Sequence, residues 1–407
     1  MLSPIPVERF AASAREASFC EFFPHEAYNS PGFHEFELGA VWHKEWISVG
    51  RAEEIPRVGD YFSATIGREP ILLVRATDRE IVALSPICRH RGMSVAEGSG
   101  HCRGAFVCPY HGWSYDLEGK LRGAPQMSGR PDFDRSRYGL PRLGVELWQG
   151  MIFINFDVAA APLAERLKSL DPLVKDWKLA ELRGEFLRDP NYRMQFEHPW
   201  NWKVYSEGQS ECYHCDKLHG TTPIMRALDF NTMKMEVDDA AAGVWAFGLR
   251  SKTLDPTINQ HGRAIFPPIP GLSEEQRYMT YAITIAPNVF IALMADSVIV
   301  LNWMPLGPQS MKVKRHRLYP QSTLDRPEFD ELHREESAAT REFVGQDEYA
   351  FERVQTGLNS WFAPRGPISP KEPVLVGFNQ WLVDRYRRAD AAARSHCDGV
   401  WPGRLPV

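Results

Sequence analysis

The chain has 407 residues, of which 43% are hydrophobic and 12% aromatic, so it can build a sizeable core and does not have the composition of a disordered protein. Its formal net charge of −5 gives no reason to expect a nucleic acid or an anionic membrane as a partner. The N-terminus lacks the basic start and long apolar stretch of a signal peptide, and the seven cysteines are an odd number. Both features predict a cytoplasmic protein in a reducing compartment, without a disulfide framework.

The first part of the chain is predicted to be rich in β-structure. Residues 1–40 form a lead-in with helical character near residues 10–22, and the β-rich region runs from residue 41 to residue 160. Its short apolar or alternating runs are bounded by Gly, Pro and Asp, which is typical of strands. These runs cover residues 61–66, 70–75, 81–85 and 151–156, and a hairpin turn is predicted at residues 116–119.

The second part of the chain mixes helical and strand patterns. Residues 161–182 carry a helical pattern that Pro172 interrupts, and a long helix is predicted over residues 326–358. The apolar stretch at residues 278–303 contains Pro287 and Asp296, so it does not predict a membrane span. The predicted strands are residues 184–188, 243–249, 278–286, 289–293, 298–303 and 311–318. The order of elements predicts a small β module followed by a larger α+β domain.

Two mixed pairs of metal ligands lie in the β-rich region. They are Cys88-Arg-His90 and Cys108-Pro-Tyr-His111, with seventeen residues between the two pairs. Two thiolates and two imidazoles suit a Rieske [2Fe–2S] cluster, in which two His replace two Cys on one iron. Zinc also takes two Cys and two His, but its sites usually pair Cys with Cys along the chain, so the mixed pairs favour the cluster. Cys102 falls outside the pattern and is predicted to be an ordinary buried thiol.

A second group of ligands follows in Glu211-Cys-Tyr-His214-Cys-Asp-Lys-Leu-His219. Glu207, Glu211, His214 and Leu218 have the spacing of one helix face. His219 lies about 100° around the helix from Leu218, so the helix must bend or end before both imidazoles can meet one metal ion. The alternative is a polar helix face with two unrelated histidines.

Two His and one carboxylate, with open positions, suit a mononuclear Fe(II) that activates oxygen. The carboxylate is expected far downstream at Asp347, which continues an apolar helical stripe formed by Phe351, Val354 and Leu358. A carboxylate in line with an apolar face points into the protein, where an unpaired charge is costly and a cation offsets that cost. Two neighbouring acidic residues fall off the stripe and are predicted to be solvated: Glu348 and Glu352.

Together these motifs resemble those of the Rieske non-haem iron oxygenases, the terminal α subunits of multicomponent oxygenases. The resemblance covers nearly the whole chain and includes Pro199-Trp-Asn-Trp-Lys203 and Gln346-Asp347, followed by Gln355-Thr-Gly357. It implies an α+β protein with a β-rich Rieske domain and a helix-grip catalytic domain, an antiparallel sheet with helices. We place these domains at residues 41–160 and 161–390, with a C-terminal tail at residues 391–407.

The same resemblance implies a homotrimer. Electrons would pass from the cluster of one subunit to the mononuclear iron of its neighbour, over an acidic bridge. Glu211 occupies the bridging position, where many members have Asp, and is therefore expected to take part in catalysis. The contact would join His111 of one chain to Glu211 and His214 of the next.

The stretch Ser210-Glu-Cys-Tyr-His-Cys215 is most similar to members that oxidise quaternary amines such as betaine, carnitine and choline, and Phe378-Asn-Gln-Trp381 also fits that subgroup. The chain departs from it at Glu207-Gly-Gln209, where such members often have Glu-Asn-Tyr or Glu-Asn-Phe. This departure is expected to reshape the pocket beside the metal. Similar frameworks also serve N- and O-dealkylation of aromatic compounds.

The predicted function is that of a terminal monooxygenase. It would use O2 to hydroxylate a small organic substrate next to nitrogen or oxygen, so that an alkyl group is lost. A separate NAD(P)H-dependent reductase, with or without a ferredoxin, would supply electrons, because the chain has no convincing Gly-rich nucleotide-binding fingerprint. The rivals are an aromatic-ring cis-dihydroxylating dioxygenase, a Rieske electron carrier and a zinc-stabilised binding protein. Parts of residues 278–303 are expected to line the substrate pocket.

Overall fold

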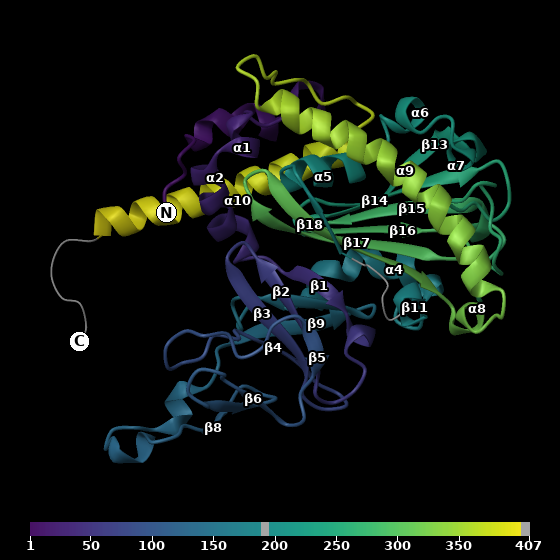
Figure 1. Cartoon of the computed structure of the whole chain (residues 1–407). Coiled ribbons are helices and arrows are strands. Elements are labelled where there is room, and N and C mark those ends of the chain that lie inside the picture. Colours follow the sequence, from purple (N-terminus) through teal and green to yellow (C-terminus); the bar gives the residue numbers. More distant parts are fainter. Residues whose placement is uncertain (189–194, 400–407) are drawn as a thin grey trace. The chain divides into compact units, whose positions relative to one another are not determined.

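The computed structural model describes residues 1–188 and 195–399, so the last eight residues of the predicted tail lie outside the described part (Figure 1). The chain divides into two compact units. The smaller unit contains Lys44–Arg166 and Leu179–Glu181, and the larger contains Met1–His43, Leu167–Lys178 and the residues from Leu182 onward. Within the described residues, no helix is long and apolar enough to cross a membrane.

The smaller unit is built on a seven-stranded antiparallel sheet with the strand order β1-β10-β9-β4-β3-β2-β5. Its strands are β1 (Ile47–Arg51), β2 (Asp60–Ile66), β3 (Glu69–Arg75), β4 (Ile81–Leu84), β5 (Ser99–His101), β9 (Arg142–Trp148) and β10 (Met151–Asn155). Every residue of β1, β4 and β10 is buried, which is the pattern of strands covered on both faces. The β-character predicted for this region is confirmed.

A second, three-stranded sheet in this unit consists of β6 (Ala105–Val107), β7 (Ser114–Asp116) and β8 (Leu121–Gly123). The predicted hairpin turn joins β7 to β8, where the Gly119 N–H donates to the Asp116 carbonyl at 3.0 Å. Gly119 has a φ of 83°, and a Cβ atom there would lie 2.9 Å from Leu84, so this turn requires glycine.

The larger unit is built on an eight-stranded antiparallel sheet with the order β11-β18-β17-β16-β15-β14-β13, in which β12 also pairs with β18. Its strands are β11 (Arg183–Gly184), β12 (Gln195–His198), β13 (Leu228–Asp239), β14 (Val244–Ser251), β15 (Met279–Ile285), β16 (Val289–Leu293), β17 (Val298–Gly307) and β18 (Ser310–Tyr319). Strand β16 alternates buried and half-buried residues, as expected when one face meets the core and the other borders a cavity.

Helices accompany this sheet in the larger unit, and α9 runs along one of its faces (Figure 1). They are α1 (Glu26–Asn29), α2 (Pro31–Glu37), α4 (Asp171–Val174), α5 (Trp202–Gln209), α6 (Cys215–Leu218), α7 (Pro223–Ala227), α8 (Gln321–Leu324), α9 (Phe329–Leu358) and α10 (Pro373–Gly399); α3 (Leu163–Leu167) begins in the smaller unit and ends in the larger. Helix α9 crosses α5, and this crossing positions the candidate metal site described below.

Several elements differ from the predictions. Residues 10–22 form short 3-10 turns at Val7–Ala14 and Ala17–Phe19 rather than a longer helix. The strand predicted at residues 184–188 is only Arg183–Gly184, followed by a 3-10 turn. Strands β12 and β13 and helix α10 are present in the structure although no sequence pattern predicts them above. Helix α10 packs against the N-terminal segment through a buried aromatic cluster: Phe10, Phe23, Phe33 and Tyr386.

A buried ion pair connects three helices of the larger unit. Glu37 at the end of α2 receives two contacts of 2.9 Å from the Lys203 ammonium on α5. The Trp202 indole N–H donates to the same carboxylate at 2.6 Å, and the Tyr386 hydroxyl of α10 also donates to it. Burial lowers the pKa of Lys203, although Glu37 opposes this shift. Removing one partner of such a pair leaves the other charge buried and uncompensated.

We therefore expect Lys203→Met to lower the free energy of unfolding of this unit by about 3 kcal/mol, because Glu37 loses its counter-charge. Urea denaturation followed by tryptophan fluorescence measures the change. The matched control is Arg388→Met, which removes a cation paired at 2.9 Å with Asp384 on the exposed face of α10 and should cost less than about 1 kcal/mol. If the two variants unfold at the same urea concentration, the buried ion pair does not stabilise this unit more than an exposed one.

Candidate functional site

Two loops of the smaller unit hold the first set of predicted ligands in nearly identical backbone frames. In the first loop, the Cys88 N–H donates to the Met93 carbonyl at 2.9 Å, and the Gly92 N–H returns to the Cys88 carbonyl at 3.0 Å. The second loop has the same two bonds. The Cys108 N–H donates to the Trp113 carbonyl at 2.7 Å, and the Gly112 N–H donates to the Cys108 carbonyl at 3.0 Å. Both glycines have positive φ angles, so the two loops share one backbone frame around their Cys, although the His follows the Cys by two positions in the first loop and by three in the second.

These loops bring the two histidines together at the surface and the two thiols together in the core. Nδ1 of His90 lies 3.1 Å from Nδ1 of His111, a separation that suits two ligands of one metal ion. Cys88 and Cys108 are buried in one hydrophobic cluster and form no disulfide. Cys102 is also a free buried thiol, as predicted.

Tyr115 is a partner of this site that the sequence analysis missed. Its hydroxyl lies 3.3 Å from Sγ of Cys88 and accepts a hydrogen bond of 3.0 Å from the Arg89 N–H. Burial raises the pKa of Tyr115, and the neighbouring Cys88 adds to the shift, so the phenol keeps its proton. A protonated hydroxyl at this position can donate to a metal-bound thiolate. Its sequence signal was weak, because a tyrosine in a strand is usually a packing residue.

The second set of predicted ligands converges in the larger unit. Nε2 of His219 lies 2.8 Å from Oδ1 of Asp347, and Nε2 of His214 lies 3.6 Å from the same oxygen. The three side chains form a group whose ligand atoms all lie within 4.8 Å of one another. His219 and Asp347 are buried and His214 is half-buried. This arrangement could hold a metal ion through both Nε2 atoms and one carboxylate oxygen.

The other ring nitrogen of each histidine has a partner of its own. Nδ1 of His214 donates to Oε1 of Glu211, and Nδ1 of His219 lies 2.7 Å from Oε1 of Gln346. A proton held on Nδ1 leaves the lone pair of Nε2 available for a metal. Gln346 precedes Asp347 directly on α9, so one helix supplies both a candidate ligand and the residue that orients another. The sequence analysis noted Gln346 only as part of a motif.

The second oxygen of Glu211 has partners within its own chain. Oε2 accepts N–H bonds from Tyr213 and His214, and a contact of this carboxylate with the His111 of a neighbouring chain stays a prediction. The side chain is 10% exposed. Burial opposes protonation of His214, but the Glu211 carboxylate and the charge of Asp347 outweigh it and raise the His214 pKa. The site is therefore electronegative, which suits a cation.

The predicted helical stripe through Glu207, Glu211, His214 and Leu218 is wrong, because the helix is broken. Helix α5 ends at Gln209, and residues 210–214 are not helical before α6 begins at Cys215. Gly208 packs so closely on α9 that a Cβ atom would lie 2.1 Å from the Phe351 ring. The break after this contact allows His214 and His219 to approach the same point.

A disulfide between Cys212 and Cys215 closes the non-helical segment around His214. The prediction of a chain without disulfides is therefore wrong at this position. The Cys-x-x-Cys spacing was the available signal, but the odd cysteine count and the absence of a signal peptide outweighed it. The disulfide limits the conformations of a segment that carries both Glu211 and His214.

The buried stripe of α9 also differs in detail from the prediction. Asp347 and Phe351 are buried as expected, but the stripe continues through Gln355, whereas Val354 is 48% exposed. Glu352 is solvated as predicted. Glu348 is not, because it is half-buried at the pocket described next, where burial raises its pKa.

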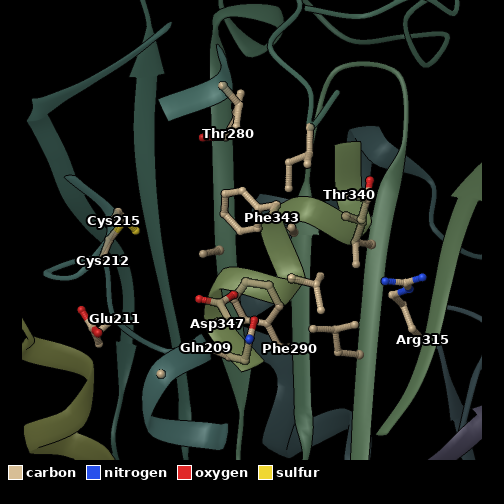
Figure 2. A pocket seen from close by; sticks show the side chains of 18 of the residues that line it. Gln209, Glu211, Cys212, Cys215, Thr280, Phe290, Arg315, Thr340, Phe343 and Asp347 are labelled. Carbon is tan, nitrogen blue, oxygen red and sulfur yellow. A yellow bond between two sulfur atoms is a disulfide. The ribbon is translucent and has the colours of Figure 1, made fainter. Parts of the chain in front are cut away.

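A pocket of about 490 Å³ opens onto the group formed by His214 and Asp347 (Figure 2). Most of its walls are apolar and come from β14 to β17 and from α9, including Phe247, Leu249, Phe290, Leu293, Leu301 and Phe343. The prediction that parts of residues 278–303 line the pocket is confirmed. Figure 2 shows Arg315 on one side of the pocket and Glu211 with the disulfide on the other.

Two protein-family profiles match the chain. The Rieske [2Fe-2S] domain matches residues 45–138, and the catalytic domain of the ring-hydroxylating alpha subunit matches residues 186–388. The two matches contain the two sets of ligands, one set in each.

Individual relatives point in the same direction. The glycine betaine monooxygenase oxygenase subunit of Chromohalobacter salexigens is 29% identical over 91% of this chain and 87% of its own length. The carnitine monooxygenase oxygenase subunit of Escherichia coli K12 is 32% identical over 52% of this chain and 55% of its own. Among solved structures, a quaternary ammonium Rieske monooxygenase superposes with a TM-score of 0.76 at 21% identity, covering 95% of this chain and all of that one. Naphthalene 1,2-dioxygenase from Rhodococcus sp. superposes with a TM-score of 0.77 at 20% identity. The match covers 95% of this chain and 99% of that one.

The disulfide can be tested by counting thiols in the denatured protein with and without a phosphine reductant. We expect reduction to expose two additional thiols in the wild type, because Cys212 and Cys215 are joined. The Cys212→Ser/Cys215→Ser double variant should show no such increase. An equal thiol count before and after reduction of the wild type, purified without reductant, would mean that the pair is reduced.

Proposed function

The chain belongs to the α subunits of the Rieske oxygenases, and from this membership we propose that it is the terminal component of a monooxygenase that dealkylates a small organic substrate at nitrogen or oxygen. The chain is thus an oxidoreductase, and its family uses a Rieske [2Fe–2S] cluster and a mononuclear iron. When these groups are bound, the cluster supplies electrons and the mononuclear iron activates O2.

The observation that carries the proposal is the convergence of His214, His219 and Asp347 at the end of a mainly apolar pocket. We assign these three residues as ligands of the mononuclear iron. Two neutral imidazoles and one carboxylate fit Fe(II), and Glu211 and Gln346 hold the remaining ring nitrogens in the tautomer that metal binding needs. An electron carrier would need neither this ligand set nor the pocket, so we reject that rival.

We assign Cys88, Cys108, His90 and His111 as ligands of the cluster. The buried thiols can hold one iron away from water, while the exposed imidazoles hold the other iron at the protein surface. A cluster with two exposed His ligands can exchange electrons with a partner through those rings. The match to the Rieske domain distinguishes the cluster from the zinc site that the sequence left open.

Monooxygenation is supported by sequence rather than by fold. The solved structures that superpose well on this chain include both a monooxygenase and a dioxygenase, with nearly equal scores. The relatives named above, whose printed names are those of glycine betaine and carnitine monooxygenase oxygenase subunits, support hydroxylation next to nitrogen. We therefore prefer dealkylation to ring dihydroxylation.

We propose that electrons reach the mononuclear iron from the cluster of a neighbouring copy in a homotrimer, and that a separate NAD(P)H-dependent reductase supplies the cluster. Exposed aromatic rings lie beside both candidate sites. Tyr110 is 51% exposed next to His111, and Tyr213 is 55% exposed between Glu211 and His214. Half-exposed tyrosines are common in protein interfaces, where they combine an apolar ring with a polar tip.

The proposal is tested by supplying the purified protein with a reductase, NADH, O2 and candidate substrates that contain N-alkyl or O-alkyl groups. Coupled NADH oxidation and release of an aldehyde, identified by mass spectrometry, is the expected result. A cis-diol product from an aromatic substrate would instead establish the dioxygenase.

Replacing Asp347 should separate the two metal centres. We expect Asp347→Ala to lose most of its mononuclear iron and keep the visible and EPR spectra of the cluster, because the site loses a donor atom and its buried negative charge. Iron analysis of the purified protein should fall from three atoms towards two per chain.

The matched control is Glu352→Ala, which removes an exposed acid from the same helix and should leave the iron content unchanged. If Asp347→Ala retains full iron while Glu348→Ala loses it, the ligand assignment is wrong, since Glu348 is the only other acidic side chain of α9 among the residues described as lining the pocket.

Glu211→Gln tests the proposed bridge. The amide keeps the size of the side chain, and its oxygen can still accept the hydrogen bond from His214 Nδ1, whereas its NH2 group gives up the N–H bonds that Oε2 accepts from Tyr213 and His214. Both metal centres should form, because the His214 ring keeps the tautomer that metal binding needs. The amide loses the negative charge that favours electron transfer through His214, and we expect cluster oxidation to slow by at least tenfold. The measurement is a single turnover, in which pre-reduced, substrate-bound protein is mixed with O2. Wild-type oxidation rates in this variant would refute the bridge.

A further inference from the structure

Two arginines that the proposed reaction does not use line the pocket: Arg315 and Arg341. Arg341 of α9 is exposed to solvent, whereas Arg315 is partly enclosed. Arg315 lies on β18, opposite Leu301 of β17, and its guanidinium reaches the pocket wall (Figure 2). It lies over the Phe196 ring, with 5.5 Å between the guanidinium carbon and the ring centroid. The side chain is half-buried, so water reaches only part of it.

Arg315 differs sharply from the arginine two positions further along the same strand. Arg317 is fully buried and donates to Glu336 at 2.7 Å, to Ser297 at 3.0 Å and 3.1 Å, and to Thr257 at 2.9 Å. Arg315 makes no hydrogen bond or ion pair with any residue in the described ranges 1–188 and 195–399. Arg317 is thus bonded within the protein, whereas the five N–H donors of Arg315 are left for another partner.

The acidic groups near Arg315 do not pair with it. Glu348 of α9 also lines the pocket and is close enough for its charge to attract Arg315, but no hydrogen bond or ion pair joins these two described residues. Its carboxylate instead lies 3.8 Å from Nε2 of His198. Burial lowers the pKa of His198 to about 4, so this ring is neutral at neutral pH. Asp347 is directed towards the two histidines. An anion from outside the protein is therefore the partner that the Arg315 donors lack.

We propose that Arg315 binds a carboxylate of the substrate, and that this contact directs the opposite end of the molecule towards His214, His219 and Asp347. The inference rests on the proposed function and adds the substrate class to it. Guanidinium and carboxylate groups match as a planar pair with two parallel hydrogen bonds, which fixes both position and orientation. The substrate class is an organic acid with an N-alkyl or O-alkyl group at the end remote from its carboxylate.

The size and walls of the pocket define the rest of the molecule. The volume of about 490 Å³ equals that of about 16 water molecules in the liquid, so a compound as small as glycine betaine leaves much of it unfilled. The walls of the same pocket include Phe290, Leu301 and Phe343. An alkyl or aromatic body between the carboxylate and the reacting group therefore suits this cavity better than a short polar one.

The test compares carboxylates with analogues of similar shape in which an uncharged group replaces the carboxylate. The probes are 4-methoxybenzoate and 4-methoxybenzamide as an aromatic pair, and glycine betaine and choline as a small pair that shares a quaternary ammonium group. Dissociation constants are measured by calorimetry on the purified protein with its cluster and iron bound, without reductant, so that no turnover is needed. We expect the wild type to bind 4-methoxybenzoate at least tenfold more tightly than the amide.

The variants then attribute this preference to Arg315. Arg315→Met should abolish the preference for the acid while leaving the affinity for the amide within about twofold. Arg315→Lys should retain part of the preference for the acid over the amide, because the positive charge remains but the planar guanidinium with its two parallel N–H donors is lost. The control is Arg353→Met, which removes an exposed arginine of α9 that stacks on Tyr349 outside the pocket and should change neither affinity.

Either of two results would overturn the inference: a wild type that binds neither carboxylate more tightly than the analogue that lacks the carboxylate, or an unchanged preference in Arg315→Met. A preference shown only by the betaine pair, and lost in Arg315→Met, would support the carboxylate site but contradict the apolar body. These readouts are separate from turnover. Failure to form any oxygenated product would count against the proposed function even if the binding preference were present.

Discussion

The arrangement of the catalytic unit depends on one buried carboxylate. Asp347 lies in the middle of a 30-residue helix, is 5% exposed and has two imidazole nitrogens within 3.6 Å. A charge in such a place is tolerated only with a compensating cation. The two histidines reach it because α5 stops at Gln209 and the chain turns before α6. The close contact of Gly208 with Phe351 sets the distance between the two helices, so the position of the site is determined by a packing constraint as much as by its polar groups.

Around this carboxylate, each histidine is held from both sides. Glu211 and Gln346 bind the Nδ1 atoms, and the Nε2 atoms turn to Asp347. The two supports differ in kind, because Gln346 is neutral and comes from the rigid α9, whereas Glu211 is charged and lies in the short segment closed by the Cys212–Cys215 disulfide. The charged support faces the side where Tyr213 is exposed to solvent. An electron that enters through His214 would therefore pass beside the Glu211 carboxylate. The ring of His219 is instead covered by the Phe343 ring, which stacks on it with 3.9 Å between the ring centroids.

The sequence was most informative where ligand spacing alone carries the chemistry. Cys88, His90, Cys108 and His111 were identified as one set because both pairs sit in short loops, and short loops keep close residues together. Reasoning from helical periodicity was less successful. It placed Glu211 and His214 on one continuous helix with Glu207, because periodicity cannot show that a glycine in close contact with a distant helix precedes a break. Val354 was misplaced for a related reason, since the sequence does not show on which side of α9 the sheet lies. Arg315 gave no signal at all, because nothing in the sequence distinguishes a paired arginine from an unpaired one.

The contrast between Arg315 and Arg317 separates an arginine that lines the pocket without internal hydrogen bonds from one that is bonded within the protein beside it. Arg317, Glu336 and Tyr319 form a fully buried network in which loss of any member leaves a polar group without a partner. Arg315 makes no hydrogen bond or ion pair within residues 1–188 and 195–399, so replacing it removes only its contact with the Phe196 ring and its attraction for Glu348. The candidate iron ligands come from α9 and from the segment after α5, whereas the proposed carboxylate site and most apolar walls come from the sheet. Residues of the sheet can therefore change to suit another substrate while the helices keep the metal geometry. This division provides a physical reason why one architecture can serve both a quaternary ammonium monooxygenase and naphthalene 1,2-dioxygenase.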